Sequence, residues 1–140
     1  MLKTILLHPE ILAALGSAGH GSRVLIADGN YPFGTGAHPA ARRVFLNLRP
    51  GCVAASDVLE ALVSAIPIEA AMVMVPADGT TPDIQRAFRK LLPDNVPLKS
   101  MGRFEFYGEA KSEDTALVIA TGEQRVFANI LLVIGVVSPQ

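Results

Sequence analysis

The chain of 140 residues has no tryptophan, one cysteine and few charged residues. A single cysteine, Cys52, excludes an internal disulfide and is typical of proteins from a reducing compartment. The net charge is −1, so the basic surface expected of proteins that bind nucleic acid or anionic membranes is lacking. The first residues do not have a signal-peptide pattern, and the longest apolar run, residues 130–137, is far shorter than a membrane span of about 20 residues. We therefore expect a cytoplasmic protein without nucleic-acid or membrane partners.

The sequence is instead rich in apolar residues, with 50% hydrophobic and only 18% charged positions. This composition excludes a disordered chain, and the length is typical of one domain over residues 1–140. A domain of this size cannot bury all of its apolar side chains internally, so we expect part of them to lie in subunit interfaces.

Hydrophobic periodicity predicts that helices alternate with strands along the chain. Helices are expected near residues 9–18, 57–66, 82–92 and 104–111, and strands near residues 23–27, 43–49, 70–75, 98–101, 115–120 and 129–137. We expect Pro9 to begin the first helix and Asp57 to cap the second. The alternation predicts a three-layer α/β/α domain with a mostly parallel or mixed sheet. The short connection between the last two strands suggests a local antiparallel or irregular element.

His20 and Asp28 lie on either side of the strand predicted over residues 23–27. His20 stands between two glycines, and its unperturbed pKa of about 6.5 suits proton transfer at neutral pH. Asp28 follows the strand at the end where open α/β sheets bind their ligands. The alternatives are an exposed loop histidine and an aspartate that only begins a turn, and the two residues alone leave both alternatives open.

Two further polar residues are candidates for ligand binding. Arg103 either clamps a polyol or an anion or pairs with a surface acid, while Phe104 and Tyr107 after it are expected to face the core. Asn129 precedes a strongly apolar strand, and its amide both donates and accepts hydrogen bonds, as sugar hydroxyls require. The alternative for Asn129 is a residue that closes a turn.

Metal, thiol and phosphate chemistry find no support. The three histidines and Cys52 lack metal-ligand spacing, and Cys52 is interpreted as a small buried hydrophobic residue. The segment Gly34–Ala37 lacks the third glycine and the following helix of a dinucleotide fingerprint, and it lacks the Gly-Lys of a phosphate-binding loop. We expect a flexible loop there, no metal, no cofactor and no nucleotide binding.

Several segments, taken in order, resemble the L-fucose mutarotase / D-ribose pyranase (RbsD/FucU) family over essentially the whole chain. They are Gly19-His20-Gly21, Leu25 to Asp28 with Asn30-Tyr31-Pro32, Arg103 to Tyr107, Thr121-Gly122-Glu123, and Ala128 to Leu132 with Gly135-Val136. The Gly-His-Gly step and the Arg103 segment are closer to the fucose branch, whereas Glu69-Ala70-Ala71 is closer to the ribose branch.

The resemblance implies an enzyme that interconverts sugar anomers or ring forms without a cofactor. It also implies a toroidal decamer with sites between neighbouring subunits, in whose interfaces the apolar segment 130–137 is a candidate contributor. By the same resemblance His20 is the proton donor, and Asp28, Arg103 and the segment Phe127-Ala128-Asn129 bind the sugar.

Phe127 departs from the family pattern, which usually has a tyrosine there, and Ser22 stands where the fucose branch tends to be acidic. Losing one hydrogen bond to the sugar costs about 0.5–1.5 kcal/mol. The leading hypothesis is therefore a monosaccharide mutarotase or pyranase, an isomerase that favours a fucose-like substrate. The alternative is a catalytically weak or silent sugar-binding or regulatory protein on the same scaffold.

Overall fold

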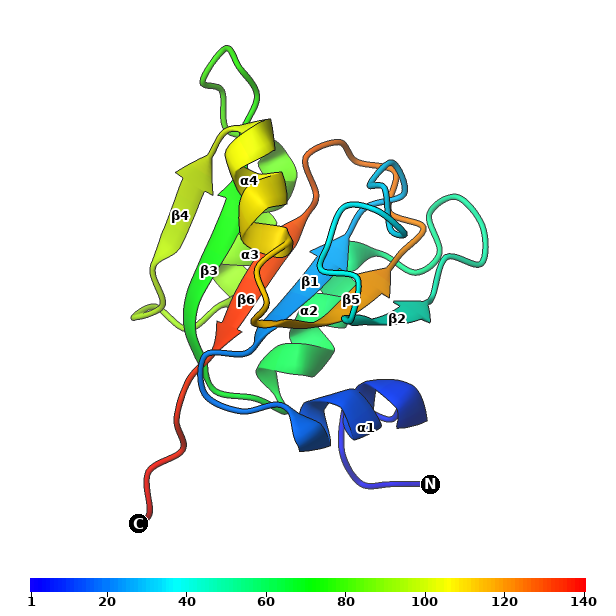
Figure 1. The fold of residues 1–140 in the computed structure, drawn as a ribbon, viewed down its shortest axis with the longest axis vertical. Helices are drawn as coiled ribbons and strands as arrows, with labels where there is room; N and C mark the ends of the chain where they lie inside the picture. Colours follow the sequence, from blue (N-terminus) through cyan, green and yellow to red (C-terminus); the bar gives the residue numbers. More distant parts are fainter.

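A computed structural model describes residues 1–140, which form one mixed six-stranded sheet with four helices (Figure 1). The elements in chain order are α1 (Pro9–Ser17), β1 (Arg23–Ala27), β2 (Arg42–Phe45), α2 (Ala55–Val63), β3 (Ile68–Met74), α3 (Asp83–Leu91), β4 (Leu98–Met101), α4 (Arg103–Ala110), β5 (Thr115–Ala120) and β6 (Ile130–Ile134). None of the helices exceeds nine residues, and none has the length and apolar character needed to cross a membrane.

The strand order is β2-β5-β1-β6-β3-β4, and only β6 runs against the others. The predicted antiparallel element near the end of the chain is therefore β6, but it is not local, because it does not pair with the preceding strand β5. β6 lies between β1 and β3, and β5 lies on the far side of β1. Because β6 is antiparallel, its first residue lies at the same edge of the sheet as the carboxyl ends of the five parallel strands.

Helices and loops cover both faces of the sheet, which confirms the three-layer architecture. On one face, Ile26 of β1 shares a core cluster with Leu59 of α2 and Phe88 of α3. On the other face, Leu25 shares a second cluster with Phe106 of α4 and with the long loop that follows β1. Figure 1 shows α4 in front of the sheet and α2 and α3 behind it. Burial of each such side chain stabilises the fold by about 1.5–3 kcal/mol.

The helix starts agree only partly with the local sequence signals. α1 begins at Pro9 as predicted, and the ring of His8 caps it by accepting the N–H of Ile11. The prediction that Asp57 caps α2 is wrong, because α2 begins two residues earlier, at Ala55, behind a residue without a capping side chain. The carboxylate of Glu123 accepts the N–H of Ala55 at 3.1 Å instead.

The segment 130–137, a candidate contributor to a subunit interface, is buried over most of β6 and exposed at Val136 and Val137. β6 is central in the sheet, and its residues 130–132 are fully buried within the chain. Phe104 was expected to face the core but is 79% exposed, because α4 buries Phe106 and Ala110, four residues apart, on its inner side. Cys52 is half-buried and not fully buried. The exposed large apolar residues are Met1, Leu2, Ile5, Leu7, Phe45, Leu48, Phe104, Val126, Val136 and Val137.

Candidate functional site

A cavity of about 280 Å³ opens at the edge where the five parallel strands end and β6 begins. Asp28 follows β1, Arg103 begins α4 just after β4, and Phe127 and Asn129 precede β6. Open α/β sheets bind ligands at this edge, because loops from several strands converge there. The fold thus brings together these four residues, which lie up to about a hundred positions apart in the sequence. The remaining walls come from Asn30, Tyr31, Met74, Tyr107 and Val126.

Asp28 is the buried acid of this cavity, with 3% of its surface exposed. Its carboxylate accepts the backbone N–H groups of Asn30 at 3.0 Å and Ala128 at 3.2 Å, and the side-chain amide of Asn129 at 3.2 Å. The side-chain carbonyl of Asn129 accepts the backbone N–H of Asp28 at 2.7 Å, so the two residues hold each other through two hydrogen bonds. Burial raises the pKa of Asp28, and the hydrogen bonds oppose the rise. A buried carboxyl group without a cationic partner is suited to proton transfer.

Phe127 has an unusual backbone conformation beside Asp28. Its φ angle of 57° is the only positive one outside glycine, and such a conformation is rare for a bulky residue. The left-handed turn points the N–H of the next residue, Ala128, at the Asp28 carboxylate. The Phe127 ring lines the cavity, where it can stack on a ligand but cannot form a hydrogen bond.

Arg103 and two tyrosines form the cationic and phenolic part of the cavity. The Arg103 guanidinium lies 5.4 Å from the centroid of the Tyr107 ring, and its Nε donates to the Tyr107 hydroxyl at 3.2 Å. Arg103 makes no ion pair with an acidic side chain, so the surface-pairing alternative for this residue is wrong. Tyr31 donates to the Gly36 carbonyl at 2.6 Å, and burial raises its pKa above the ordinary value. The Tyr107 hydroxyl proton is the phenolic donor left for a ligand.

His20 lies at the opposite end of the strands, where the parallel strands begin. It precedes β1, whereas Asp28 follows it, and the five residues of β1 separate the two by on the order of 15 Å. The His20 side chain is 61% exposed, and its Nε2 lies 2.9 Å from the Glu69 carboxylate near the start of β3. A single chain therefore does not bring His20 to the cavity that contains Asp28. Sequence reasoning did not identify Glu69 as its partner, because the pairing spans 49 positions.

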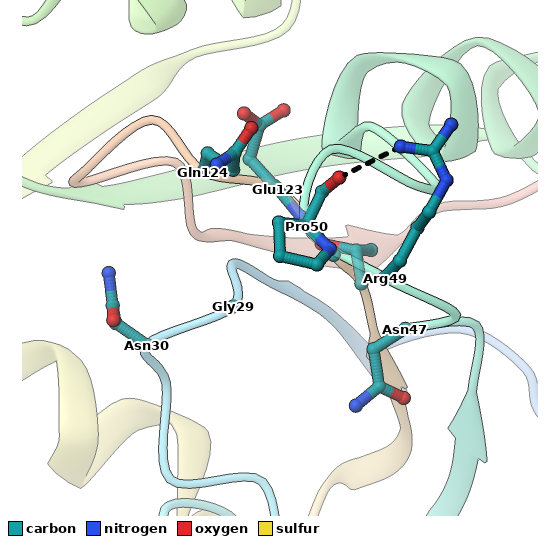
Figure 2. A pocket seen from close by; sticks show the side chains of 9 residues that line it. Gly29, Asn30, Asn47, Arg49, Pro50, Glu123 and Gln124 are labelled. Atoms are coloured by element: carbon teal, nitrogen blue, oxygen red, sulfur yellow. Dashed lines mark hydrogen bonds between the residues drawn. The ribbon is translucent and has the colours of Figure 1, made fainter.

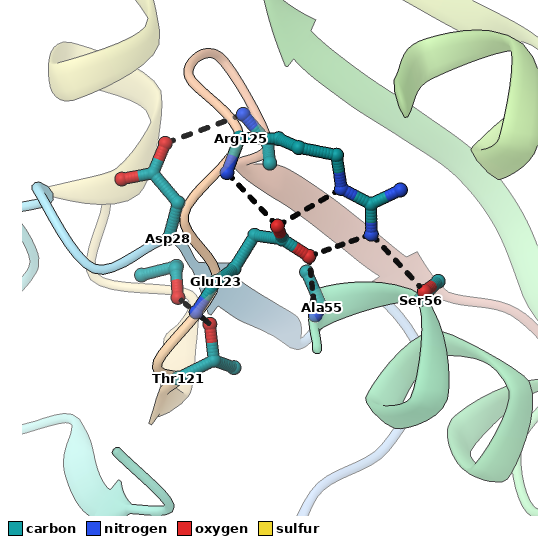
Figure 3. Close-up of polar contacts among 8 residues, drawn as sticks. Asp28, Ala55, Ser56, Thr121, Glu123 and Arg125 are labelled. Carbon is teal, nitrogen blue, oxygen red and sulfur yellow. Dashed lines mark hydrogen bonds and ion pairs between the residues drawn. The ribbon is translucent and has the colours of Figure 1, made fainter. Parts of the chain in front are cut away.

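A second buried carboxylate, Glu123, stands near Asp28 after β5 (Figure 3). The Arg125 guanidinium donates to it at 2.8 and 2.9 Å, and the backbone N–H groups of Arg125 and Ala55 donate at 2.9 and 3.1 Å. The hydrogen bonds from Arg125 are the main reason that the pKa of Glu123 falls to about 2. Glu123 is thus engaged in holding the loop before β6 to the start of α2.

A polar cavity of about 410 Å³ adjoins the first one (Figure 2). It lies between the ends of β1, β2 and β5, and Asn30 borders both cavities. The side chains of Asn47, Arg49 and Gln124 also line it. Its one buried acid, Glu123, is already paired with Arg125, so this cavity offers polar contacts and no free acid.

The remaining sequence candidates have structural explanations. Gly36 packs against Tyr31, where a Cβ atom would come within 2.6 Å of the ring, so the Gly34–Ala37 segment is a turn packed on the loop after β1. No group of three or more His, Cys, Asp or Glu side chains is placed to hold a metal ion. Two cavities thus lie at the carboxyl ends of the parallel strands, and a third, of about 480 Å³, lies beside α3.

Comparisons with known proteins identify relatives over the whole length of the chain. The model of the RbsD / FucU transport protein family matches residues 1–137. The structure of Bacillus subtilis RbsD complexed with D-ribose is similar with a TM-score of 0.85 and 23% identity, covering 99% of this chain and 100% of that one. The fucose mutarotase from Streptococcus pneumoniae in complex with L-fucose gives a TM-score of 0.83 and 23% identity at the same coverage. FucU from Bifidobacterium longum gives 0.75 and 29% identity, covering 94% and 95%.

Proposed function

Because the chain belongs to the RbsD / FucU family, we propose that it is a cofactor-independent monosaccharide mutarotase or pyranase. The observation that carries this proposal is the cavity that buried Asp28, held by Asn129, shares with Arg103, with which it forms no ion pair. Similar structures contain D-ribose in one case and L-fucose in another. The Gly-His-Gly step and the Arg103–Tyr107 segment favour a fucose-like sugar over ribose.

The reaction needs two proton-transfer groups and no metal. Ring opening requires that one group takes the proton of the anomeric hydroxyl while another gives a proton to the ring oxygen. We assign the first role to the Asp28 carboxylate and the second to His20, with Arg103 and Asn129 orienting the hydroxyl groups. The bond between the anomeric carbon and the ring oxygen then breaks, and the open-chain aldehyde closes again from its other face or through another hydroxyl. Positioned acid–base groups accelerate such a step by about 10²–10⁴-fold.

The two roles require two copies of the chain. His20 and Asp28 lie at opposite edges of one sheet, so His20 must reach the cavity of a neighbouring subunit. Exposed apolar side chains border the cavity, since Val126 lines it and Phe104 follows Arg103. Exposed apolar surface of this kind is typical of subunit contacts. We propose a ring-shaped homo-oligomer, a decamer by family resemblance, whose sites lie between neighbouring subunits.

The alternative function is silent sugar binding, which rests on Phe127. Phenylalanine cannot supply the hydrogen bond that the family tyrosine would give. However, Tyr107 lines the same cavity and keeps a hydroxyl proton available. Its presence favours turnover over silent binding.

Anomer exchange measured by saturation-transfer NMR tests the proposal. With a panel that includes L-fucose and D-ribose, we expect faster exchange between the α and β anomers for at least one sugar. His20→Ala should abolish the acceleration, whereas the control His38→Ala, a loop histidine whose ring caps the N–H of Ala40, should retain it. If no sugar exchanges faster but one raises the Tm, the protein is a silent sugar-binding protein.

Subunit mixing tests whether each site is shared. His20→Ala and Asp28→Asn subunits are each expected to be inactive. After unfolding and refolding together they should regain about a quarter of the wild-type activity, because one site in four then takes both intact residues from different chains. If mixed subunits stay inactive, or if light scattering shows an active monomer, the shared site is wrong.

A further inference from the structure

Gln85 is a buried polar residue that contacts the wall of the candidate site from the opposite face of the sheet. It lies on α3, on the face of the sheet opposite α4, and 3% of its surface is exposed. Its side-chain amide donates to the carbonyl of Met74, the last residue of β3, at 2.7 Å and to the carbonyl of Phe127 at 3.2 Å. Both of these residues line the cavity. One amide therefore ties together two segments of the cavity wall.

The peptide unit between Phe127 and Ala128 links Gln85 to Asp28. Its carbonyl accepts the Gln85 amide, and its N–H donates to the Asp28 carboxylate at 3.2 Å. The preceding φ angle of 57° is costly for a bulky residue, so this peptide plane needs contacts that hold it. Gln85 holds one end of the plane and Asp28 the other.

We propose that Gln85 is a positioning residue, which fixes the Phe127–Ala128 peptide so that its N–H remains on Asp28. This role rests on the proposed function, in which Asp28 transfers a proton. If the Phe127 carbonyl is released, the turn relaxes, the Asp28 carboxylate loses the Ala128 N–H, and the Phe127 ring leaves its place in the wall.

A purely structural role for Gln85 makes a different prediction. A residue that only satisfies two buried carbonyl groups would lower stability on substitution and leave the chemistry of Asp28 unchanged. The titratable and charged groups that share the cavity with Asp28 are Tyr31, Tyr107 and Arg103. None of them contacts Gln85 through a hydrogen bond, and His20, the proposed proton donor, governs the basic limb of the pH profile. A shift of the acidic limb in a Gln85 variant therefore reports on Asp28.

The test compares Gln85→Met with Ile84→Val, a core substitution at the preceding position of α3. For Gln85→Met we expect kcat/KM for anomer exchange to fall about 10–100-fold. The acidic limb of its pH profile should move to higher pH, because a carboxylate that loses a donor is easier to protonate. Ile84→Val should lower the Tm and leave the profile unchanged. Gln85→Glu keeps the size of the side chain and offers at most one O–H donor, so we expect an intermediate loss, and it carries the test if Gln85→Met does not fold.

A wild-type pH profile in Gln85→Met, or a loss no larger than that of Ile84→Val, overturns the positioning role. If the wild-type protein exchanges no sugar, the proposed function fails, and hydrogen exchange then decides about Gln85 alone. Amides of residues 127–129 are expected to exchange faster in Gln85→Met than in the wild type and in Ile84→Val. Equal exchange rates in all three proteins overturn the proposal independently of activity.

Discussion

Asp28 and Glu123 are two buried carboxyl groups that follow neighbouring strands, β1 and β5, yet their environments differ in one respect. The exposed fraction is 3% for Asp28 and 4% for Glu123, and each carboxylate accepts several hydrogen bonds. Glu123 also has a cation, Arg125, and its pKa falls to about 2. Asp28 has only neutral donors, and burial raises its pKa.

The difference shows that the counter-charge, more than the degree of burial, decides what a buried carboxylate can do. Glu123 is fixed as an anion and serves to hold α2 and the loop before β6. Burial raises the pKa of Asp28, no cation opposes the rise, and the residue lines a cavity. The first group is structural, and the second is the candidate for chemistry.

The largest expected effect is on activity. Asp28→Asn should lower kcat/KM for anomer exchange by about 10²–10⁴-fold, because the proton acceptor is lost. Glu123→Gln, the matched carboxyl-to-amide change, should stay within about tenfold of the wild type, since it removes a loop contact and no reacting group. Saturation-transfer NMR measures both variants. A greater loss in Glu123→Gln than in Asp28→Asn would reverse the assignment.

The effects of the two substitutions on stability should have the opposite order, with the larger loss in Glu123→Gln. Glu123→Gln is expected to lower the free energy of unfolding by about 2 kcal/mol, because hydrogen bonds to a charged group contribute about 1.5–3 kcal/mol. Asp28→Asn loses bonds only to neutral donors and should cost less. Urea denaturation at pH 7 measures both, and equal losses would contradict the idea that Arg125 makes the difference.

The two carboxyl groups should also respond to pH with opposite signs. The stabilisation from Glu123 is present above its ordinary pKa of 4.5 and is lost as the pH falls toward its folded pKa of about 2. The pKa of Asp28 is raised, so its contribution is present below the ordinary pKa and is lost as the pH rises through the folded value. When the Tm is measured from acid to neutral pH, it should depend less steeply on pH at the acid end in Glu123→Gln than in the wild type. An unchanged acid side in that variant would remove Glu123 from the acid transition.

The smallest expected effect concerns the wall beside Asp28. Phe127→Tyr should raise the exchange rate of L-fucose about two- to tenfold if the missing phenol limits turnover, which corresponds to one net hydrogen bond. D-ribose in the same assay shows whether the gain is specific. An unchanged rate would mean that Phe127 belongs to a site built for a different sugar.

Local sequence signals predicted most helices and strands and, in the site, the positions of Asp28 and Asn129 at strand ends. The apolar run over residues 23–27 predicted β1 and therefore the place of Asp28 at a strand end. The residues around Asn129 predicted the start of an apolar strand, and β6 begins at Ile130. These features depend on neighbours in the sequence, which periodicity records.

The features that were not predicted depend on distant partners. The start of α2 depends on Glu123, 68 positions away, and the left-handed turn at Phe127 is held by Gln85, 42 positions away. Glutamine is a residue type typical of solvent-facing helix positions, so nothing in the local sequence predicts that Gln85 is buried. The place of β6 between β1 and β3 likewise follows from tertiary packing and from no local signal.

The position of β6 has a consequence for how the chain folds. β6 is the last strand in chain order, yet it is the only strand that joins the group β2-β5-β1 to the pair β3-β4 in the sheet. On a ribosome the two parts of the sheet must wait side by side until residues 130–134 emerge and join them. Such non-local pairing slows folding and leaves two strand edges open until that moment. Asn129 arrives with the same segment, so the candidate site and the complete sheet form in one late event.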